Sequence, residues 1–375
     1  MSPSWKTEPL GRIATLQRGF DLPARSRKRG TVPIVTSSGV EDTHSEARVK
    51  GPGVVTGRCG TIGEVFFVRD DFWPLNTTLY VREFHGNDPL YVSYLLRTID
   101  FHTHSGKSGV PGVNRNDLHE IVVSLPSTKA EQEAIAEALS DADALADSIE
   151  NLLRKKRYVR QGAMQQLLNG RIRLPGFAKS WSKELLRSIV RTPVTDGPHL
   201  TPRFLTAGIP FLSVNNLVDN KIDLTDLRYI SNEDHAVFSR KCKPQTNDIL
   251  FGKAASVGRV AFVDLELEFN VWSPIALIRV GAEHVPRFVY YQLQSADVVT
   301  QIELLTNSSS QGNIGMGDIE QLVLQLPCWE EQAAIARVLS DIDAEIVTLE
   351  TQLSKARELK RGMMKELLTG RIRLV

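Results

Sequence analysis

The sequence is poor in cysteine, and its cysteines are scattered. Cys59, Cys242 and Cys328 form no CxxC pair, which argues against a structural zinc site and against a disulfide framework. No run of 18 apolar residues occurs, and the first 17 residues contain no apolar core of signal-peptide length. We therefore expect a cytoplasmic protein that does not associate with a membrane.

An excess of charge of either sign is also missing. The chain has 45 basic and 44 acidic residues, a net charge of +1, so no global positive field indicates a polyanion partner. If the protein binds nucleic acid, the basic residues must be clustered locally. With 375 residues, 42% of them hydrophobic, the chain is long enough for two domains that each have a core.

Motifs for catalysis and for cofactor binding are absent too. No GxGxxG fingerprint follows an expected strand, and no two prolines are adjacent as in the catalytic loop of a base-flipping methylase. The residues Gly106, Lys107 and Ser108 resemble the end of a P-loop but lack its first glycine. His102 and His104 form a single His-x-His pair in a polar loop, and such residues are more often solvated than bound to a metal. We expect a binding protein that is not itself an enzyme and holds no metal or cofactor.

The strongest feature of the sequence is an internal repeat. Residues 131–174 align with residues 331–374 at a constant offset of 200, and 23 of these 44 positions are identical. The segments before the two copies share shorter landmarks in the same order, such as GRCGTIG at 57–63 and GKAASVG at 252–258. The repeat divides the chain into two globular domains, each followed by a helical segment. The four parts are residues 1–128, 129–175, 176–328 and 329–375.

Each repeated segment is expected to form one long helix that pairs with the other. Apolar residues recur at alternating spacings of four and three, as in the seam where two helices of a coiled coil meet. Each helix has a cation at the same seam position, Arg160 in the first and Lys360 in the second. Gly170 and Gly370 follow the last apolar position, where helices end. Residues 131–150 contain seven acids and no base, whereas residues 151–169 contain five bases and no acid. Antiparallel pairing with pseudo-twofold symmetry would place opposite charges together. A rod of about 60 Å would then separate the domains.

The globular domains are expected to be α+β and largely antiparallel. Short runs of β-branched and aromatic residues alternate with Gly- and Pro-rich turns. Short helices are expected at residues 90–99 and 286–295. The predicted fold is thus two mainly antiparallel α/β domains separated by two long paired helices.

These motifs together resemble the specificity subunit of type I restriction-modification systems. The similarity rests on the repeated EQxxIAxxLSDxDA and LLxGRIRL blocks, and on TDGPHLTP at 195–202 and QGNIGMGDI at 311–319. Pro198 departs from the Thr that is usual in the first of these stretches. The resemblance covers nearly the whole chain.

The resemblance implies a concrete function. Each target recognition domain of that family reads one half of a bipartite sequence in double-stranded DNA, and the helices set the spacing. Two methylation subunits, which carry S-adenosylmethionine, dock on the helices, and restriction subunits with ATP and magnesium can join them. The specificity subunit itself is not catalytic. A rod of roughly 60 Å corresponds to about 18 base pairs.

The DNA-binding residues are expected among the polar and basic loops of both domains, because phosphates bind Lys and Arg and base edges bind Arg, Asn, Gln, Ser and Thr. The candidates in the first domain are Arg25, Arg27, Lys28, Arg29, Arg58, Lys107 and Arg115. The candidates in the second domain are His199, Thr201, Arg203, Asn215, Asn216, Lys241, Lys243, Lys253, Asn307, Ser308 and Gln311.

A partner surface is expected at the two GRIRL ends. Its candidates are Arg171, Arg173, Arg371 and Arg373, for which capping of helix-end carbonyls is an equal alternative. Two other functions stay open from the sequence. One is a free-standing methylase or nuclease, and the other is a coiled-coil scaffold that binds proteins and no DNA.

Overall fold

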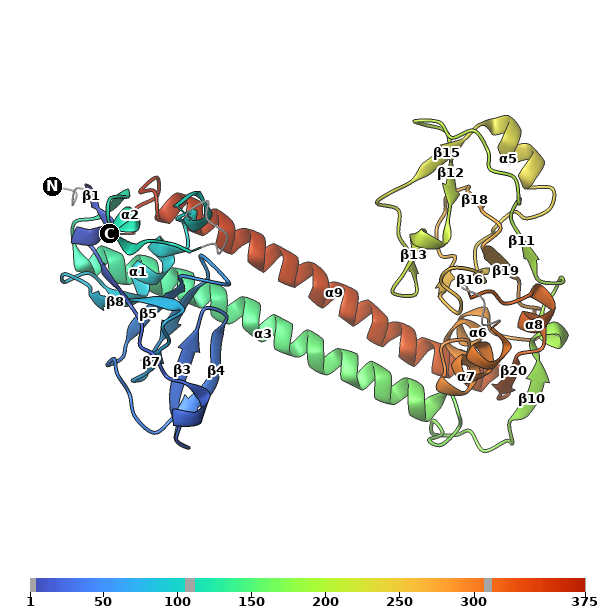
Figure 1. The fold of residues 1–375 in the computed structure, drawn as a ribbon. Coiled ribbons are helices and arrows are strands. Elements are labelled where there is room, and N and C mark those ends of the chain that lie inside the picture. The colour runs from blue at the N-terminus through green and yellow to red at the C-terminus, as the bar shows by residue number, and fades with distance from the viewer. Residues whose placement is uncertain (1–4, 105–111, 307–311, 375) are drawn as a thin grey trace. The chain divides into compact units, whose positions relative to one another are not determined.

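The computed structural model describes residues 5–104, 112–306 and 312–374. The chain divides into two compact units. Figure 1 colours the chain from blue at the N-terminus to red at the C-terminus. The first unit comprises Met1–Asn151 and Glu350–Val375, and the second comprises Leu152–Leu349. Each unit therefore contains one globular domain and about half of each long helix.

The first unit is built on a four-stranded antiparallel sheet with the strand order β2-β8-β5-β6. A three-stranded sheet, β4-β3-β7, lies beside it and contains one parallel pair, β3 with β7. The strands β1 and β9 pair separately. The bounds are β1 Trp5–Pro9, β2 Thr15–Arg18, β3 Val32–Thr36, β4 Gly39–His44, β5 Gly53–Gly57, β6 Val65–Val68, β7 Trp73–Pro74, β8 Thr78–Glu83 and β9 Val122–Pro126.

The second unit repeats this plan. Its four-stranded antiparallel sheet has the order β11-β19-β16-β17, and its three-stranded sheet, β15-β12-β18, again has one parallel pair, β12 with β18. The pairs β10–β20 and β13–β14 complete it. The bounds are β10 Ser182–Leu185, β11 Thr195–Asp196, β12 Ile209–Leu212, β13 Leu217–Val218, β14 Lys221–Ile222, β15 Arg228–Ile230, β16 Ile249–Gly252, β17 Val260–Phe262, β18 Asn270–Val271, β19 Ile275–Ile278 and β20 Val323–Leu326.

Two short helices lie near the predicted positions: α1 packs against β5 and β6, and α6 packs against β17 and β20. The helix α1 begins at Pro89 because Asp88 caps it by accepting a hydrogen bond from the Tyr91 amide, at 2.7 Å. The helix α6 likewise begins with a proline, Pro286, whose fixed φ suits a first turn. The bounds are α1 Pro89–Leu96, α2 Arg115–His119, α4 Leu186–Ile189, α5 Asn232–Phe238, α6 Pro286–Gln292, α7 Ala296–Leu305 and α8 Met316–Glu320.

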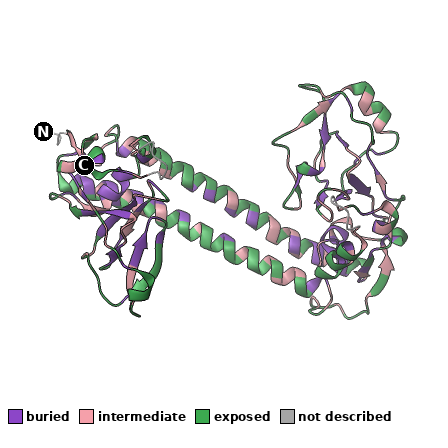
Figure 2. Cartoon of the chain, viewed as in Figure 1, coloured by how far each residue is buried: buried purple, intermediate pink, exposed green. Residues whose placement is uncertain are grey.

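The two long helices are α3, Lys129–Leu167, and α9, Trp329–Leu367. The predicted seam residues are all buried or half-buried, and Figure 2 shows the buried stripes on both helices. They are Ile135, Leu139, Ala142, Ala146, Ile149, Leu153, Lys156, Arg160, Ala163 and Leu167 in α3, and Ile335, Leu339, Ile342, Ile346, Leu349, Leu353, Ala356, Lys360, Met363 and Leu367 in α9. In the first unit, Glu150 pairs with Arg357 at 2.8 Å, and Asp143 pairs with Lys360 at 2.5 Å. Because the partner's number falls as the residue's number rises, the helices are antiparallel, as predicted from their charges.

The helices join the core of each domain. Ile135 and Leu139 of α3 and Leu367 of α9 belong to the core of the first unit. Gly170 and Gly370 end the helices with φ angles of 68° and 71°, which glycine adopts without strain. The predicted fold class is therefore confirmed. Among the described residues, no helix combines the length and the apolarity needed to cross a membrane.

Candidate nucleic-acid interface

A glycine-bounded turn between β16 and β17 places Lys253 at one end of the second unit's main sheet. A Cβ on Gly252 would lie 2.4 Å from the Ser256 carbonyl oxygen, and Gly258 has a φ of +83°. Both positions therefore favour glycine. The Lys253 amide donates to the Pro274 carbonyl at 2.8 Å, which fixes where the lysine leaves the backbone.

The turn meets two other predicted segments at a buried carboxylate, Asp196 of β11. The Lys253 Nζ lies 3.0 Å from Asp196 Oδ2, and the Lys241 Nζ lies 2.5 Å from Oδ1. The His199 Nε2 lies 3.3 Å from Oδ2. The structure thus brings together three residues predicted from separate parts of the sequence.

Asp196 itself was missed by the sequence analysis, although it lies in the TDGPHLTP stretch. Its carboxylate has no exposed surface. Burial opposes ionisation, but the hydrogen bond from Lys241 and the nearby ammonium group of Lys253 outweigh it and hold the pKa of Asp196 below its ordinary value. Asp196 is therefore charged at neutral pH.

The other candidates of the second domain, apart from Asn216, fall into three groups. Thr201, Arg203 and Asn215 are exposed, and Lys243 forms a surface ion pair with Glu268 at 2.6 Å. Asn307, Ser308 and Gln311 lie outside the described residues.

Asn216 has a structural role. It is only 7% exposed, and its side-chain amide donates to the carbonyls of Asp223 and Asp226 at 3.0 and 2.9 Å. Its Oδ1 accepts from the Ser213 amide at 2.9 Å. A buried side chain with these partners has no atom left for DNA, so the expectation for Asn216 does not fit its surroundings.

The first unit has the same turn between β5 and β6. A Cβ on Gly57 would lie 1.7 Å from the Thr61 carbonyl oxygen, and Gly63 has a φ of +85°. Arg58 follows Gly57 as Lys253 follows Gly252, and the Arg58 carbonyl accepts from the Val113 amide at 3.0 Å. The Lys253 carbonyl accepts from the Ile314 amide in the same way, at 2.9 Å. The two turns are equivalent in sequence and in contacts.

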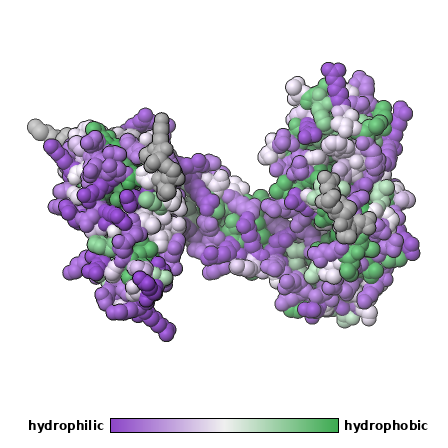
Figure 3. Space-filling model, in the orientation of Figure 1, coloured by the Kyte–Doolittle hydropathy of each residue, from purple (hydrophilic) through white to green (hydrophobic). Residues whose placement is uncertain are grey.

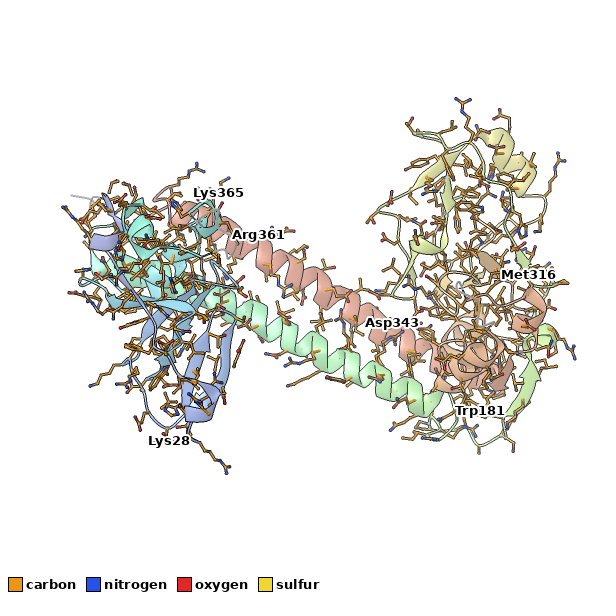
Figure 4. The ribbon with its side chains drawn as sticks, viewed as in Figure 1. Lys28, Trp181, Met316, Asp343, Arg361 and Lys365 are labelled. Carbon is orange, nitrogen blue, oxygen red and sulfur yellow. The ribbon has the colours of Figure 1, made fainter. Side chains whose placement is uncertain are left out.

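The predicted basic cluster of the first domain lies against β4. Arg27 pairs with Asp42 at 2.8 Å, and the hydrogen bond from Arg27 helps to lower the pKa of Asp42. Lys28 lies 3.7 Å from Glu46, and Arg25 and Arg29 are exposed. Figure 4 shows Lys28 at the outer end of this domain, where the surface in Figure 3 is mainly hydrophilic.

The two remaining candidates of the first domain come later in the chain. Arg115 is exposed at the first position of α2. Lys107 lies outside the described residues.

The GRIRL arginines divide into two pairs. Arg173 binds both carboxylate oxygens of Glu331 at 2.6 Å, and Arg373 binds Glu131 in the same manner. These bonds raise the pKa of both arginines. Both arginines thus hold their own unit together. Glu331 and Glu131 were missed as their partners because they lie 158 and 242 residues away from these arginines in the sequence. Arg171 and Arg371 remain exposed.

A second repeated contact joins each domain to its helices. The Tyr291 hydroxyl donates to Asp343 at 2.7 Å, and Arg160, a predicted polar seam residue, binds the other oxygen at 2.5 Å. The first unit repeats this contact with Tyr94, Asp143 and Lys360. The polar seam residues Arg160 and Lys360 therefore have two roles. They join the two long helices, and they help to hold each domain on the helix pair.

Comparison with known proteins agrees with this duplicated architecture. Residues 3–156 and 205–358 match the family described as type I restriction modification DNA specificity domain. The chain belongs to this family. The resemblance inferred from the repeated motifs is thereby confirmed.

Two curated relatives carry names from the same system. The chain is 26% identical over 273 residues to the type I restriction enzyme EcoBI specificity subunit of Escherichia coli, which covers 66% of this chain and 56% of that protein. It is 24% identical over 307 residues to the MjaVIII specificity subunit of Methanocaldococcus jannaschii, which covers 76% of this chain and 71% of that protein. The match therefore spans little more than half of the EcoBI subunit.

A solved structure shares the fold. The type I restriction-modification S subunit from M. genitalium superposes with a TM-score of 0.70 at 14% sequence identity. The similarity covers 98% of this chain and 96% of that one. Two domains and two long helices are thus an arrangement that a known S subunit also adopts.

Proposed function

We propose that this chain is the non-catalytic DNA specificity subunit of a type I restriction-modification complex. Each globular domain reads one half of a bipartite target in double-stranded DNA, and the paired helices set the distance between the halves. The observation that carries this proposal is the glycine-bounded turn, which recurs in both domains and presents a cation each time, Arg58 and Lys253. A duplicated reading domain suits a target with two different halves.

The partners follow from this role. Two methylation subunits bring S-adenosylmethionine and the catalytic groups to DNA in the cytoplasm. Restriction subunits with ATP and magnesium join them in the complete adenine methyltransferase and endonuclease. The present chain supplies sequence recognition and no step of the chemistry.

Docking of a partner on the helices is supported by apolar side chains on their outer faces. In the second unit, Leu152, Tyr158 and Val159 of α3 are 49%, 67% and 54% exposed. Exposed apolar groups of this kind are typical of protein contact surfaces. Arg171 and Arg371, which are exposed near the helix ends, provide polar contacts for a partner, and Arg371 lies 3.5 Å from Glu366.

A salt titration tests the proposal. The chain is purified with its methylation subunits, and binding to labelled duplexes is followed by fluorescence anisotropy between about 50 and 200 mM salt. Six or more phosphate contacts predict that log K falls with log salt at a slope of about −5 or steeper. Replacing Arg58 and Lys253 by Ala should make the slope shallower by about 2.

A matched control and two other outcomes complete the test. Arg337→Ala removes an exposed cation of α9, 4.0 Å from Asp341, and should leave the slope unchanged. A protein-binding scaffold without DNA specificity would show no slope with any variant. Methyl transfer by the purified chain alone would instead favour a free-standing methylase.

A further inference from the structure

The charges around Asp196 do not balance. Other ion pairs of this domain have one cation for one acid, as Arg287 has Asp264 at 3.2 Å and Arg279 has Asp248 at 2.7 Å. Around Asp196, two ammonium groups share one carboxylate. One positive charge is therefore left over at this point.

The surplus charge faces outward. Lys253 is 13% exposed and Asp196 is fully buried, so these two form the base of the cluster. Lys241 is 52% exposed and His199 is 70% exposed, so these two form its outer face. An ammonium group has three N–H donors, and Lys241 uses one of them on Asp196.

The backbone under the cluster is held in place. A Cβ on Gly197, the residue after Asp196, would lie 1.8 Å from the Val271 carbonyl oxygen. Gly252, the residue before Lys253, is enclosed by its own turn. A rigid cluster loses little conformational freedom when it binds an anion, which favours binding.

Strand register identifies the equivalent position in the first domain. Asp196 pairs with Ala276 of β19, and Gly252 pairs with Ile275, the residue before Ala276. In the first domain, Arg18 pairs with Leu79 of β8, and Gly57 pairs with Thr78, the residue before Leu79. Arg18 therefore takes the place of Asp196 in the first domain, where Arg58 replaces Lys253. Arg18 lies 4.0 Å from one acid, Asp21, and Arg58 adds a second cation, so both domains carry a surplus positive charge at this position through different residues.

We propose that Lys241, Lys253 and His199 bind one backbone phosphate of the DNA, and that Asp196 is the positioning residue that holds the two ammonium groups at it. The inference rests on the proposed function. A phosphate oxygen accepts from several donors at once and matches a surplus positive charge. The exposed residues Thr201, Arg203 and Asn215 remain available for base edges.

Single uncharged phosphates test this site directly. The full complex with its methylation subunits is titrated with duplexes that carry the methylation motif found in cells, each with one methylphosphonate in the half-site of the second domain. The wild type should lose affinity by about three- to tenfold at one or two positions. Lys241→Gln should weaken binding to the unmodified duplex and respond no further at those positions.

Matched variants separate positioning from general damage. Arg337→Gln removes an exposed cation of α9 that is not a DNA-binding candidate and lies 4.0 Å from Asp341, so it should keep the wild-type response. Lys241→Arg should restore most of the affinity. Asp196→Asn should lose affinity and reduce the salt slope by about 1, a change that a merely structural role would not produce. Thermal melting verifies that each variant is folded.

Two results would overturn the inference. If Lys241→Gln and Lys253→Gln both respond to every methylphosphonate as the wild type does, the phosphate site is wrong although the specificity function stands. If the wild-type complex shows no sequence preference for any duplex, both the site and the proposed function fail.

Discussion

Arg173 binds both carboxylate oxygens of Glu331 at 2.6 Å, although 158 residues separate the two in the sequence. Glu331 has no exposed surface, and Arg373 and Glu131 repeat the contact in the first unit. Each pair ties the segment after one long helix to the first turn of the other helix. The cost of desolvating these carboxylates is offset only while the arginine is present.

Removing one of these arginines should therefore destabilise its unit. Arg173→Ala leaves Glu331 buried without its cation, and the melting temperature should fall by roughly 5–10 °C. Arg171→Ala, two residues away and exposed, should change it by less than about 2 °C. Differential scanning calorimetry of the full chain measures both. Equal effects of the two substitutions would contradict a structural role for the pair.

Loss of the tyrosine contact should weaken the attachment of each domain to its helices. Tyr291→Phe removes the hydrogen bond to Asp343 and should lower the free energy of unfolding by about 1.5–3 kcal/mol, because the acceptor is charged. Tyr94→Phe should act similarly in the first unit. Tyr158→Phe, at a tyrosine that is 67% exposed, serves as the control in urea denaturation. The interpretation fails if Tyr291→Phe is as mild as the control.

Two glycines, Gly197 and Gly162, should respond to alanine in opposite directions. Gly197→Ala would place a Cβ 1.8 Å from the Val271 carbonyl oxygen, so the backbone must move and the second domain should be strongly destabilised. Gly162 lies within α3 with no atom within 4 Å of the added Cβ. Gly162→Ala should therefore stabilise the helix by about 0.5–1 kcal/mol. Thermal melts that show the same sign for both variants would contradict this assignment.

The stability that Asp196 contributes should depend on pH in the acid range. Because the pKa of Asp196 is lower in the folded protein than its ordinary value of 3.8, its contribution is fully present above about pH 4–5. It is lost as the pH falls through the folded value. Wild type and Asp196→Asn should differ by about 1.5–3 kcal/mol at pH 7 and converge below pH 4. Urea denaturation at several pH values measures the difference, and one that stays constant with pH would exclude an ionised Asp196.

The helical architecture could be predicted from the sequence because its signals are local. Heptad spacing and the glycines after the last apolar position predicted both helices, and the structure ends them at Leu167 and Leu367. The acidic and basic halves predicted their antiparallel pairing. The expected helix at residues 286–295 is present as α6, Pro286–Gln292.

The candidate site could be predicted only in part, because its contacts are not local. His199, Lys241 and Lys253 were each recognised as candidates, but no spacing indicated that one carboxylate would join them. Asp196 resembles an ordinary turn residue until β11 pairs with β19 and buries it. Asn216 was misjudged for the same reason, since the carbonyls that bind it follow seven and ten residues later.

The most direct test is to map methylated adenines across the genome of cells that express this chain with its methylation subunit. The wild type should produce one motif with two specific halves and a fixed spacer. Thr201→Ala, Arg203→Ala and Asn215→Ala combined should relax only the half that the second domain reads. Arg25→Ala, Arg27→Ala, Lys28→Ala and Arg29→Ala combined should alter only the other half. If the wild type leaves no methylation motif, or if both sets affect the same half, sequence recognition by two separate domains is contradicted.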